Sequence, residues 1–120
     1  MQYMLLIYDN EKNWAQIPEP EQGKIFQAYM EFTQGIVKSG HFRAGDALQP
    51  TSTATTVTVK DGKRVTTDGP FAETKEQLGG YYLVEAKDLD EAIAIAAKIP
   101  SVNYGGKIEV RPVMETPKPG

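Results

Sequence analysis

Residues Thr67–Tyr82, which read TDGPFAETKEQLGGYY, separate a β-hairpin pattern from a strand pattern. Asp68 and Gly69 are typical of turns, because an Asp side chain bonds nearby backbone groups and Gly accepts a positive φ, while Pro70 fixes its own φ. Phe71 follows at once, and we expect its ring to anchor the turn in the core. The stretch therefore predicts a rigid loop that joins a hairpin to a strand of the main sheet.

The rest of the chain alternates strand and helix patterns around this loop. Apolar runs without polar alternation are typical of strands covered on both faces, and apolar residues spaced by three and four are typical of helices. The predicted strands lie at residues 3–8, 42–48, 55–59, 64–67, 81–86 and 107–114, and the predicted helices at about 21–39 and between an Asp88 cap and Pro100. This β-α-β-(hairpin)-β-α-β order predicts an α+β fold, a ferredoxin-like sandwich with both helices on one face of an antiparallel sheet.

Each predicted helix carries an apolar stripe that we expect to face the sheet. In the first helix the stripe consists of Ile25, Tyr29, Phe32 and Ile36, widened by Phe26, Met30 and Val37. In the second helix it consists of Leu89, Ala92, Ile93, Ala96 and Ala97. Asp88 and Glu91 have the spacing of a capping box, which predicts where the second helix begins.

Two loop geometries fit the hairpin around residues 60–62. A three-residue loop with Gly62 in the left-handed region places Val57 opposite Val65, whereas a two-residue loop places Val57 opposite Thr66. We prefer the first pairing because it gives a cleaner apolar face. Beyond the loop, Gly79 and Gly80 indicate either a β-bulge or a point where a ligand approaches the backbone.

Two predicted strands, 3–8 and 81–86, are apolar on both sides, although the helices can cover only one face of the sheet. An uncovered apolar sheet face of this size is typical of an interface. A symmetric pair of chains that stack their sheets would cover it, since both copies then bury the same surface. We therefore expect a homodimer, a dimeric α+β barrel.

Composition excludes several classes of function. The 120 residues suffice for one domain, predicted at 1–114 and followed by a flexible proline-containing tail at 115–120. The net charge of -3, with scattered basic residues, argues against nucleic-acid binding. With no Cys and one His, disulfides, thiolate metal centres and zinc sites are not expected, nor is a cofactor or a metal. No secretion signal or membrane-spanning stretch is visible, so we expect a cytoplasmic protein that does not enter a membrane.

Residues 67–81 resemble the signature of the DGPF-domain proteins, a branch of the YCII-related group, with support from 4–8, 45–50 and 108–112. The resemblance implies a dimeric ferredoxin-like fold. Members are mostly uncharacterised, and the wider group has been suggested to contain enzymes because a histidine and an aspartate line a cleft. That histidine would lie near Tyr29 here, so the pair does not carry over. DGPF-type proteins are also often linked with extracytoplasmic-function sigma factors.

The candidate site residues come mainly from the loop. Asp68, Glu73 and Lys75 are the candidate catalytic groups, because a carboxylate or amine held in a cleft can transfer protons or anchor an anion. Each also has a plainer interpretation, Asp68 as a turn cap and the other two as a solvated linker with a weak ion pair. The candidate ligand-binding residues are Phe71, Tyr81 and Tyr82, which would form a pocket wall, and the single imidazole, His41.

These residues are compatible with two functions. In the first, the protein binds a small molecule in a cleft near the DGPF loop and the dimer seam, and if it is an enzyme it uses acid–base chemistry. In the second, it is a non-enzymatic regulatory protein that docks a partner, for example one linked with a sigma factor. A pocket holding a carboxylate with a raised pKa favours the first, and the lack of an enclosed cavity favours the second.

Overall fold

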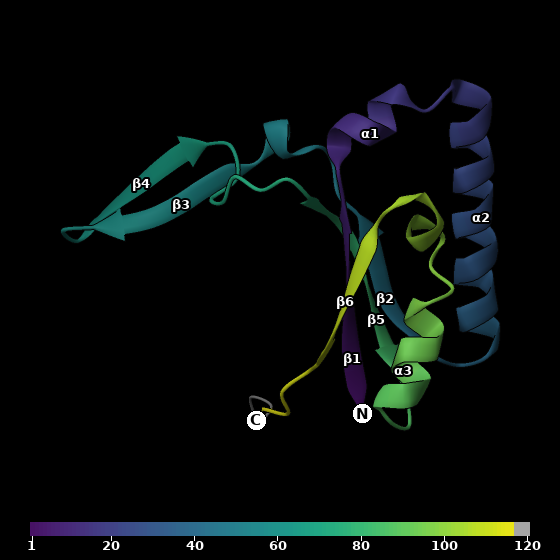
Figure 1. Ribbon diagram of the computed structural model, residues 1–120. Helices are drawn as coiled ribbons and strands as arrows, with labels where there is room; N and C mark the ends of the chain where they lie inside the picture. The colour runs from purple at the N-terminus through teal and green to yellow at the C-terminus, as the bar shows by residue number, and fades with distance from the viewer. Residues whose placement is uncertain (117–120) are drawn as a thin grey trace.

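The computed structural model describes residues 1–116 and has a four-stranded sheet, a separate two-stranded hairpin and three α-helices in this part of the chain (Figure 1). The strands are β1 (Gln2–Asp9), β2 (Phe42–Ala47), β3 (Thr55–Lys60), β4 (Lys63–Asp68), β5 (Gln77–Glu85) and β6 (Lys107–Pro112). The helices are α1 (Glu11–Gln16), α2 (Glu19–Lys38) and α3 (Leu89–Ala96), with 3-10 turns η1 (Thr51–Thr53) and η2 (Pro100–Tyr104).

The main sheet has the strand order β2-β5-β1-β6, and every neighbouring pair is antiparallel. The chain crosses from β1 to β2 through α2 and skips β5, and it crosses from β5 to β6 through α3 and skips β1. The prediction of an α+β fold with an antiparallel sheet is confirmed, and the strand order is compatible with a ferredoxin-like arrangement. Pro112 ends β6, which is an edge strand, as its missing N–H requires.

The core lies between the sheet and the two longer helices, which stand on the same side of it (Figure 1). Alternate residues of the central strands point to this side, and Leu5, Val84 and Ile99 are its largest completely buried side chains. The opposite face of the sheet carries no helix, and Met4 and Leu6 of β1 remain partly exposed there.

The predicted helix stripes are only half right. In α2, Ile25 and Ile36 are buried, but Phe26, Met30 and Val37 are more than half exposed. A helix that rests on a sheet is covered along one narrow line, so a stripe widened to a third of its circumference cannot all be buried.

The second helix faces the sheet through only part of its predicted stripe, since Ala92 and Ala96 are buried as expected. The carboxylate of Asp88 accepts a hydrogen bond from the Glu91 backbone at 2.9 Å, which confirms the cap. However, Leu89 and Ile93 are exposed, and Ile95 and Ile99 are buried instead. The helix ends at Ala96, before the predicted stop at Pro100, and the turn that follows brings Ile99 under the sheet.

Helix α1 has no counterpart among the elements predicted from the sequence. The side chain of Asn10 caps it by accepting from the Lys12 backbone at 3.0 Å. The Gln22 amide of α2 then donates to the carbonyl oxygens of Trp14 and Ile17, both at 3.1 Å. Six residues are too few to show a helical period, so contacts with α2 fix this helix rather than its own pattern.

The preferred register of the hairpin is wrong. Val57 lies opposite Thr66, the pairing of the two-residue loop, and Asp61 and Gly62 have φ values of 52° and 75°. Two residues with positive φ form the tight turn that matches the twist of paired strands. An apolar face cannot select the register of this hairpin, because the hairpin packs on no core and nearly all its residues are exposed.

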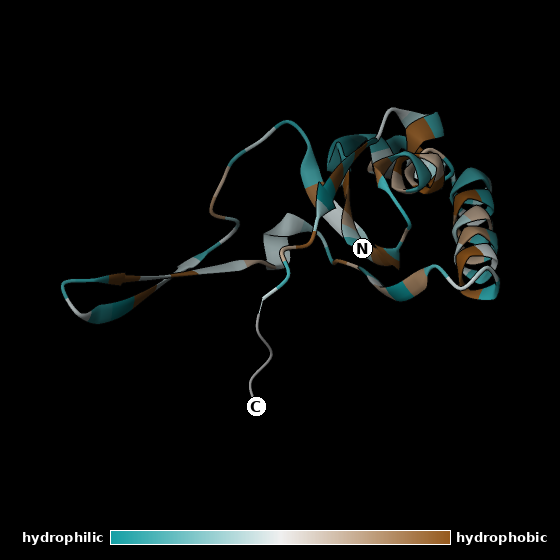
Figure 2. Cartoon of the chain, turned by 90° about the horizontal axis from the view of Figure 1, so that it is seen from below, coloured by the Kyte–Doolittle hydropathy of each residue, from teal (hydrophilic) through white to brown (hydrophobic). Residues whose placement is uncertain are grey.

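The hairpin Thr55–Asp68, which we call the arm, projects away from the body of the molecule (Figures 1 and 2). The Cα radius of gyration is 16.6 Å, whereas a compact chain of this length has about 14 Å. All arm residues except Thr56 are exposed. Beyond β6, residues 113–116 have no regular structure, and the remainder of the predicted tail, 117–120, lies outside the described residues.

Truncation of a core residue should be far more costly than the same change on the arm. We expect Leu5→Ala to lower the free energy of unfolding by about 2–5 kcal/mol, because Leu5 is fully buried and a cavity would remain. Val59→Ala, on the exposed arm, is the control and should change it by less than about 0.5 kcal/mol. Urea denaturation followed by circular dichroism measures both. Equal losses would mean that the arm belongs to the cooperative core.

Candidate functional site

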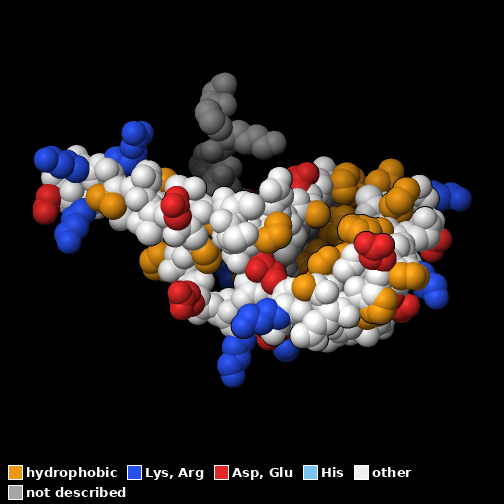
Figure 3. All heavy atoms as spheres, turned by 90° about the horizontal axis from the view of Figure 1, so that it is seen from above, with side chains coloured by type: hydrophobic (Ala, Val, Ile, Leu, Met, Phe, Trp, Pro, Cys, Tyr) orange, Lys and Arg blue, Asp and Glu red, His pale blue; other side chains and the backbone are white. Residues whose placement is uncertain are grey.

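A pocket of about 900 Å³ opens at the end of the molecule where α1 meets the first half of α2. Figure 3 shows this hollow, whose walls are mainly hydrophobic. Its aromatic lining consists of Trp14, Phe26, Tyr29, Phe42, Tyr81, Tyr82 and Tyr104. Both its size and its apolar character are those of ligand pockets in proteins, which usually measure about 300–1,000 Å³.

Side-chain contacts hold the roof of the pocket in place. The Glu11 carboxylate accepts hydrogen bonds from the backbone and the hydroxyl of Thr51, both at 2.8 Å, which ties α1 to η1. The Trp14 and Phe26 rings meet edge to face with centroids 5.5 Å apart, which ties α1 to α2. The pocket is therefore built before a ligand arrives.

The two glycines of β5 shape the pocket floor. Ile7 pairs with Gly80 but Tyr8 pairs with Leu78, so Gly79 is the extra residue of a β-bulge, one of the two interpretations given from sequence. A Cβ atom on Gly80 would lie 3.0 Å from a backbone oxygen of β2. Both glycines also line the pocket.

A hydrogen-bonded chain of three side chains lies at the inner end of the pocket. The Ser101 hydroxyl donates to Asp9 Oδ2 at 3.2 Å, and a short hydrogen bond joins the same Ser101 oxygen to the Tyr29 hydroxyl. Because the Ser101 proton is directed to Asp9, Tyr29 donates to Ser101. The strand β1, the helix α2 and the turn η2 each supply one of the three side chains, so these hydrogen bonds exist only in the folded protein.

The environment shifts the acidity of this group. Burial raises the pKa of the Asp9 carboxyl above its usual value of 3.8, and the negative charge of Glu76 raises it further, while the Ser101 hydrogen bond opposes both. Burial raises the pKa of Tyr29 to about 12, so its hydroxyl stays protonated and keeps donating. A half-buried carboxyl with a raised pKa in a pocket is a candidate for proton transfer.

Glycine is required next to this carboxylate. A Cβ atom on Gly106 would lie 2.4 Å from Asp9 Oδ1 and 2.8 Å from the carbonyl oxygen of Ser101. Real Cβ atoms do not come so close, so any larger residue would displace one of the two. Gly106 thus lets β6 begin directly beside the Asp9 side chain.

The structure does not bring the predicted catalytic residues together. Asp68 lies on the arm and Glu73 in the loop that follows, and both side chains are exposed and without a polar partner among the described residues. Phe71 is 90% exposed, so the expectation that it anchors the turn in the core is wrong. Of the three candidate catalytic groups, only Lys75 lines the pocket.

Two of the predicted ligand-binding residues do line the pocket. Tyr82 packs with Phe32 and Phe42, and its hydroxyl is 2.7 Å from that of Thr33. Tyr81 donates to Asp46 Oδ2 at 2.7 Å on the neighbouring strand. Their aromatic neighbours on the helices were not selected from sequence as site residues.

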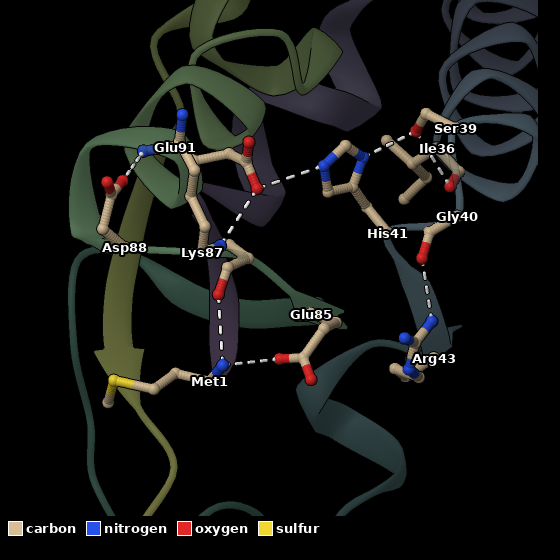
Figure 4. Close-up of polar contacts among 11 residues, drawn as sticks. Met1, Ile36, Ser39, Gly40, His41, Arg43, Glu85, Lys87, Asp88 and Glu91 are labelled. Atoms are coloured by element: carbon tan, nitrogen blue, oxygen red, sulfur yellow. Dashed lines mark hydrogen bonds and ion pairs between the residues drawn. The ribbon is translucent and has the colours of Figure 1, made fainter.

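His41 lies at the other end of the molecule and does not line the pocket. Figure 4 shows its ring between two side chains, with Nδ1 2.7 Å from the Ser39 hydroxyl and Nε2 3.2 Å from Glu91 Oε1. The same Glu91 oxygen accepts from the Lys87 backbone at 3.0 Å. The imidazole therefore ties the end of α2 to the start of α3.

Comparison with known proteins places the chain in a family. The family model of the YCII-related domain matches residues 1–117. The chain belongs to the YCII-related family. It is also 35% identical to an uncharacterized protein of Rhizobium meliloti (strain 1021) over 114 residues, which is 94% of this chain and 92% of that protein.

Two kinds of feature are absent from the part of the chain that the structure describes. No cluster of three or more His, Asp or Glu side chains is placed to hold a metal ion within residues 1–116. None of the helices in that range has the length and apolar character needed to cross a membrane.

Sequence reasoning missed Asp9, Ser101 and Gly106. Asp9 was not selected as a site residue, although a carboxylate directly after a predicted buried strand is a signal that could have been used. Tyr29 was assigned to the core stripe, and it is the position near which the family resemblance places a histidine. Ser101 and Gly106 give no local signal in the sequence. Ser101 acquires its role from a hydrogen bond to Asp9, which lies more than ninety residues earlier in the chain, and Gly106 from its position beside that pair.

Removal of the Asp9 charge should stabilise the protein in a pH-dependent way. Because folding raises the pKa of Asp9, ionisation costs stability as the pH rises from about 4 through the raised value. Asp9→Asn should therefore raise the midpoint of thermal unfolding by a few degrees at pH 7 and by much less at pH 3, where both states are protonated.

Differential scanning calorimetry at the two pH values measures this effect. Asp61→Asn on the exposed arm is the matched control and should show no such difference. An Asp9→Asn gain that is the same at both pH values would contradict a role for titration of this carboxyl.

Proposed function

We propose that this YCII-related protein binds a small, largely apolar molecule in the pocket under α1 and α2, and that Asp9 exchanges a proton with it. The single observation that carries the proposal is that Asp9, a half-buried carboxylate with a raised pKa, lines an aromatic pocket of about 900 Å³. This is the first of the two functions inferred from sequence, with the site moved away from the DGPF loop.

The other acidic groups around the pocket are already engaged. Glu11 accepts two hydrogen bonds from η1, and both oxygens of Glu76 lie 2.8 Å from the Lys107 ammonium. Asp46 accepts from Tyr81. Asp9 is left with one hydroxyl partner, Ser101, and no cation among the described residues. A ligand group that donates a hydrogen bond would satisfy it.

The chemical class of the ligand follows from this lining. Flat aromatic walls favour a planar ring system, and the carboxylate favours a hydroxyl or amine placed at one end of it. In an acid–base reaction Asp9 would take a proton from that group, or from a carbon acidified by it, and would return the proton to another atom of the same molecule. Tyr29 and Ser101 position the carboxylate by their hydrogen bonds.

The regulatory alternative remains a prediction. The described residues contain no feature that distinguishes a sigma-factor-linked partner, whereas the pocket is the feature that favours ligand binding over this alternative.

We also propose that the protein is a homodimer through the open face of the sheet. Along β1 this face presents Met4, Leu6 and Tyr8, and the neighbouring strand β5 adds Tyr81 and Leu83 in register. A contiguous apolar surface of two paired strands is what a second identical sheet would bury.

Ligand binding can be tested with 8-anilinonaphthalene-1-sulfonate, a planar aromatic dye. The chain has one tryptophan, Trp14, and it lines the pocket, so bound dye should quench its fluorescence. Ala47→Phe puts a ring at the pocket rim and should weaken dye binding at least about fivefold, on the order of 1 kcal/mol.

Ala94→Phe makes the same change on the exposed side of α3 and is the control. Equal dye affinity of the wild type and both variants would contradict binding in the pocket. The same assay, run against planar metabolites with a hydroxyl or amine, would then identify the ligand, and Asp9→Asn would test the proton-exchange role by its effect on affinity against pH.

The sheet-face dimer is tested by placing a charge on it. We expect Leu6→Lys to raise the dimer dissociation constant at least about tenfold, because the ammonium would lose its water in the interface. Gln34→Lys on the exposed side of α2 should leave it unchanged. Sedimentation equilibrium measures both. A wild-type chain that is monomeric at micromolar concentration would contradict the proposal.

A further inference from the structure

The arm has an apolar content that nothing in its own chain covers. Val57 and Val59 lie two residues apart on one side of β3 and are 60% and 68% exposed. Phe71, just past the end of the arm, is 90% exposed. A two-stranded hairpin without a covered face is only marginally stable in water. The arm therefore needs a surface to rest on.

The base of the arm is nevertheless firmly held. The Gly69 backbone donates to the Ala54 carbonyl oxygen at 2.7 Å, and the Thr56 hydroxyl donates to the Gly69 carbonyl oxygen at 2.8 Å. Gly69 has a φ of 101°, which a residue with a side chain rarely adopts. The Asp-Gly-Pro turn thus fixes the direction in which the arm leaves the sheet.

That direction is toward the open face of the sheet. In both Figure 1 and Figure 2 the arm extends on the side opposite α2. Each of its strands has six residues and spans about 20 Å, whereas stacked sheets lie about 10 Å apart. An arm of this length passes the sheet of a stacked second copy and reaches the helices beyond it.

The tip of the arm is basic, and the rest of the chain is acidic. Residues 60–64 contain Lys60, Lys63 and Arg64 but one acidic residue, Asp61, and Figure 3 shows this cluster at the end of the arm. They hold three of the thirteen basic and one of the sixteen acidic side chains, so the remaining chain has fifteen acidic against ten basic. A second copy of this chain therefore offers the tip a complementary charge.

From these observations we infer that the arm clasps a second copy of the chain, with Phe71 buried at the base of the contact and the basic tip against the partner's acidic body. The inference rests on the sheet-face homodimer proposed above and is independent of the ligand. It gives the DGPF segment a role: the turn sets the arm, and the exposed ring of Phe71 is an interface anchor, not part of a catalytic site.

The experiment compares dimer dissociation constants by sedimentation equilibrium in low salt and in about 0.15 M salt. Phe71→Ala should raise the constant at least about tenfold at both salt concentrations, because an aromatic anchor is lost. The double variant Lys60→Glu and Lys63→Glu should raise it severalfold, and this effect should shrink as salt increases, because it is electrostatic.

Two matched controls keep the outcomes distinct. Met30→Ala removes an exposed apolar side chain from α2. Lys12→Glu with Lys98→Glu makes the body more acidic, so it should leave the dissociation constant unchanged or lower it, the opposite of the change on the arm. All variants should keep the wild-type circular dichroism spectrum, since the altered side chains are exposed in the single chain. If a variant loses that spectrum, the wild-type protein still tests the clasp. Dimers mixed from two isotope-labelled forms are cross-linked, and mass spectrometry should find Lys63 linked to a peptide of the partner; no such link would overturn the clasp.

Each result has a separate meaning. Dimers that form with unchanged affinity in Phe71→Ala and in the charge-reversed arm would overturn the clasp and leave the sheet-face dimer standing. A monomeric wild-type chain would overturn both. Dye binding in the pocket tests ligand binding separately, and the dye affinity should not depend on whether the clasp or the sheet-face dimer is overturned.

Discussion

The structure depends on burial along the central strand β1. This strand pairs with β5 on one side and β6 on the other, and its alternate residues Tyr3, Leu5 and Ile7 lie in the core. Both crossover helices pack on that one face, so removal of these side chains from water drives the whole body together. All other features follow from how completely each face is covered.

On the covered side, the helices differ in length, and the pocket results from the difference. Helix α3 has eight residues and covers one end of the sheet, whereas α2 has twenty and runs along the entire length (Figure 1). At the far end only α1 and the turn η2 close the space between α2 and the sheet. The Asp9–Ser101–Tyr29 chain lies there, where incomplete packing leaves room and partial burial raises the pKa of the carboxyl.

On the uncovered side lie the open face of the sheet and the projecting arm (Figure 1). The apolar residues that β1 and β5 present there are unfavourable in water, and the arm extends on the same side. The proposed homodimer would cover both, and it would keep the proposed ligand site and the dimer contact on opposite faces of the sheet. One face would bind the ligand, and the other would bind a second copy.

The sequence by itself determined the order of the strands and of the two longer helices, the antiparallel sheet and the Asp88 cap, because the patterns that indicate them lie within short stretches of chain. The tertiary structure alone decided the site. Ser101 meets Asp9 only after η2 folds back on β1, and Gly106 matters only through that contact. The tertiary structure also decided that Phe71 is exposed. The sequence shows that an aromatic residue follows a turn, but it does not show whether other residues of the same chain pack against its ring.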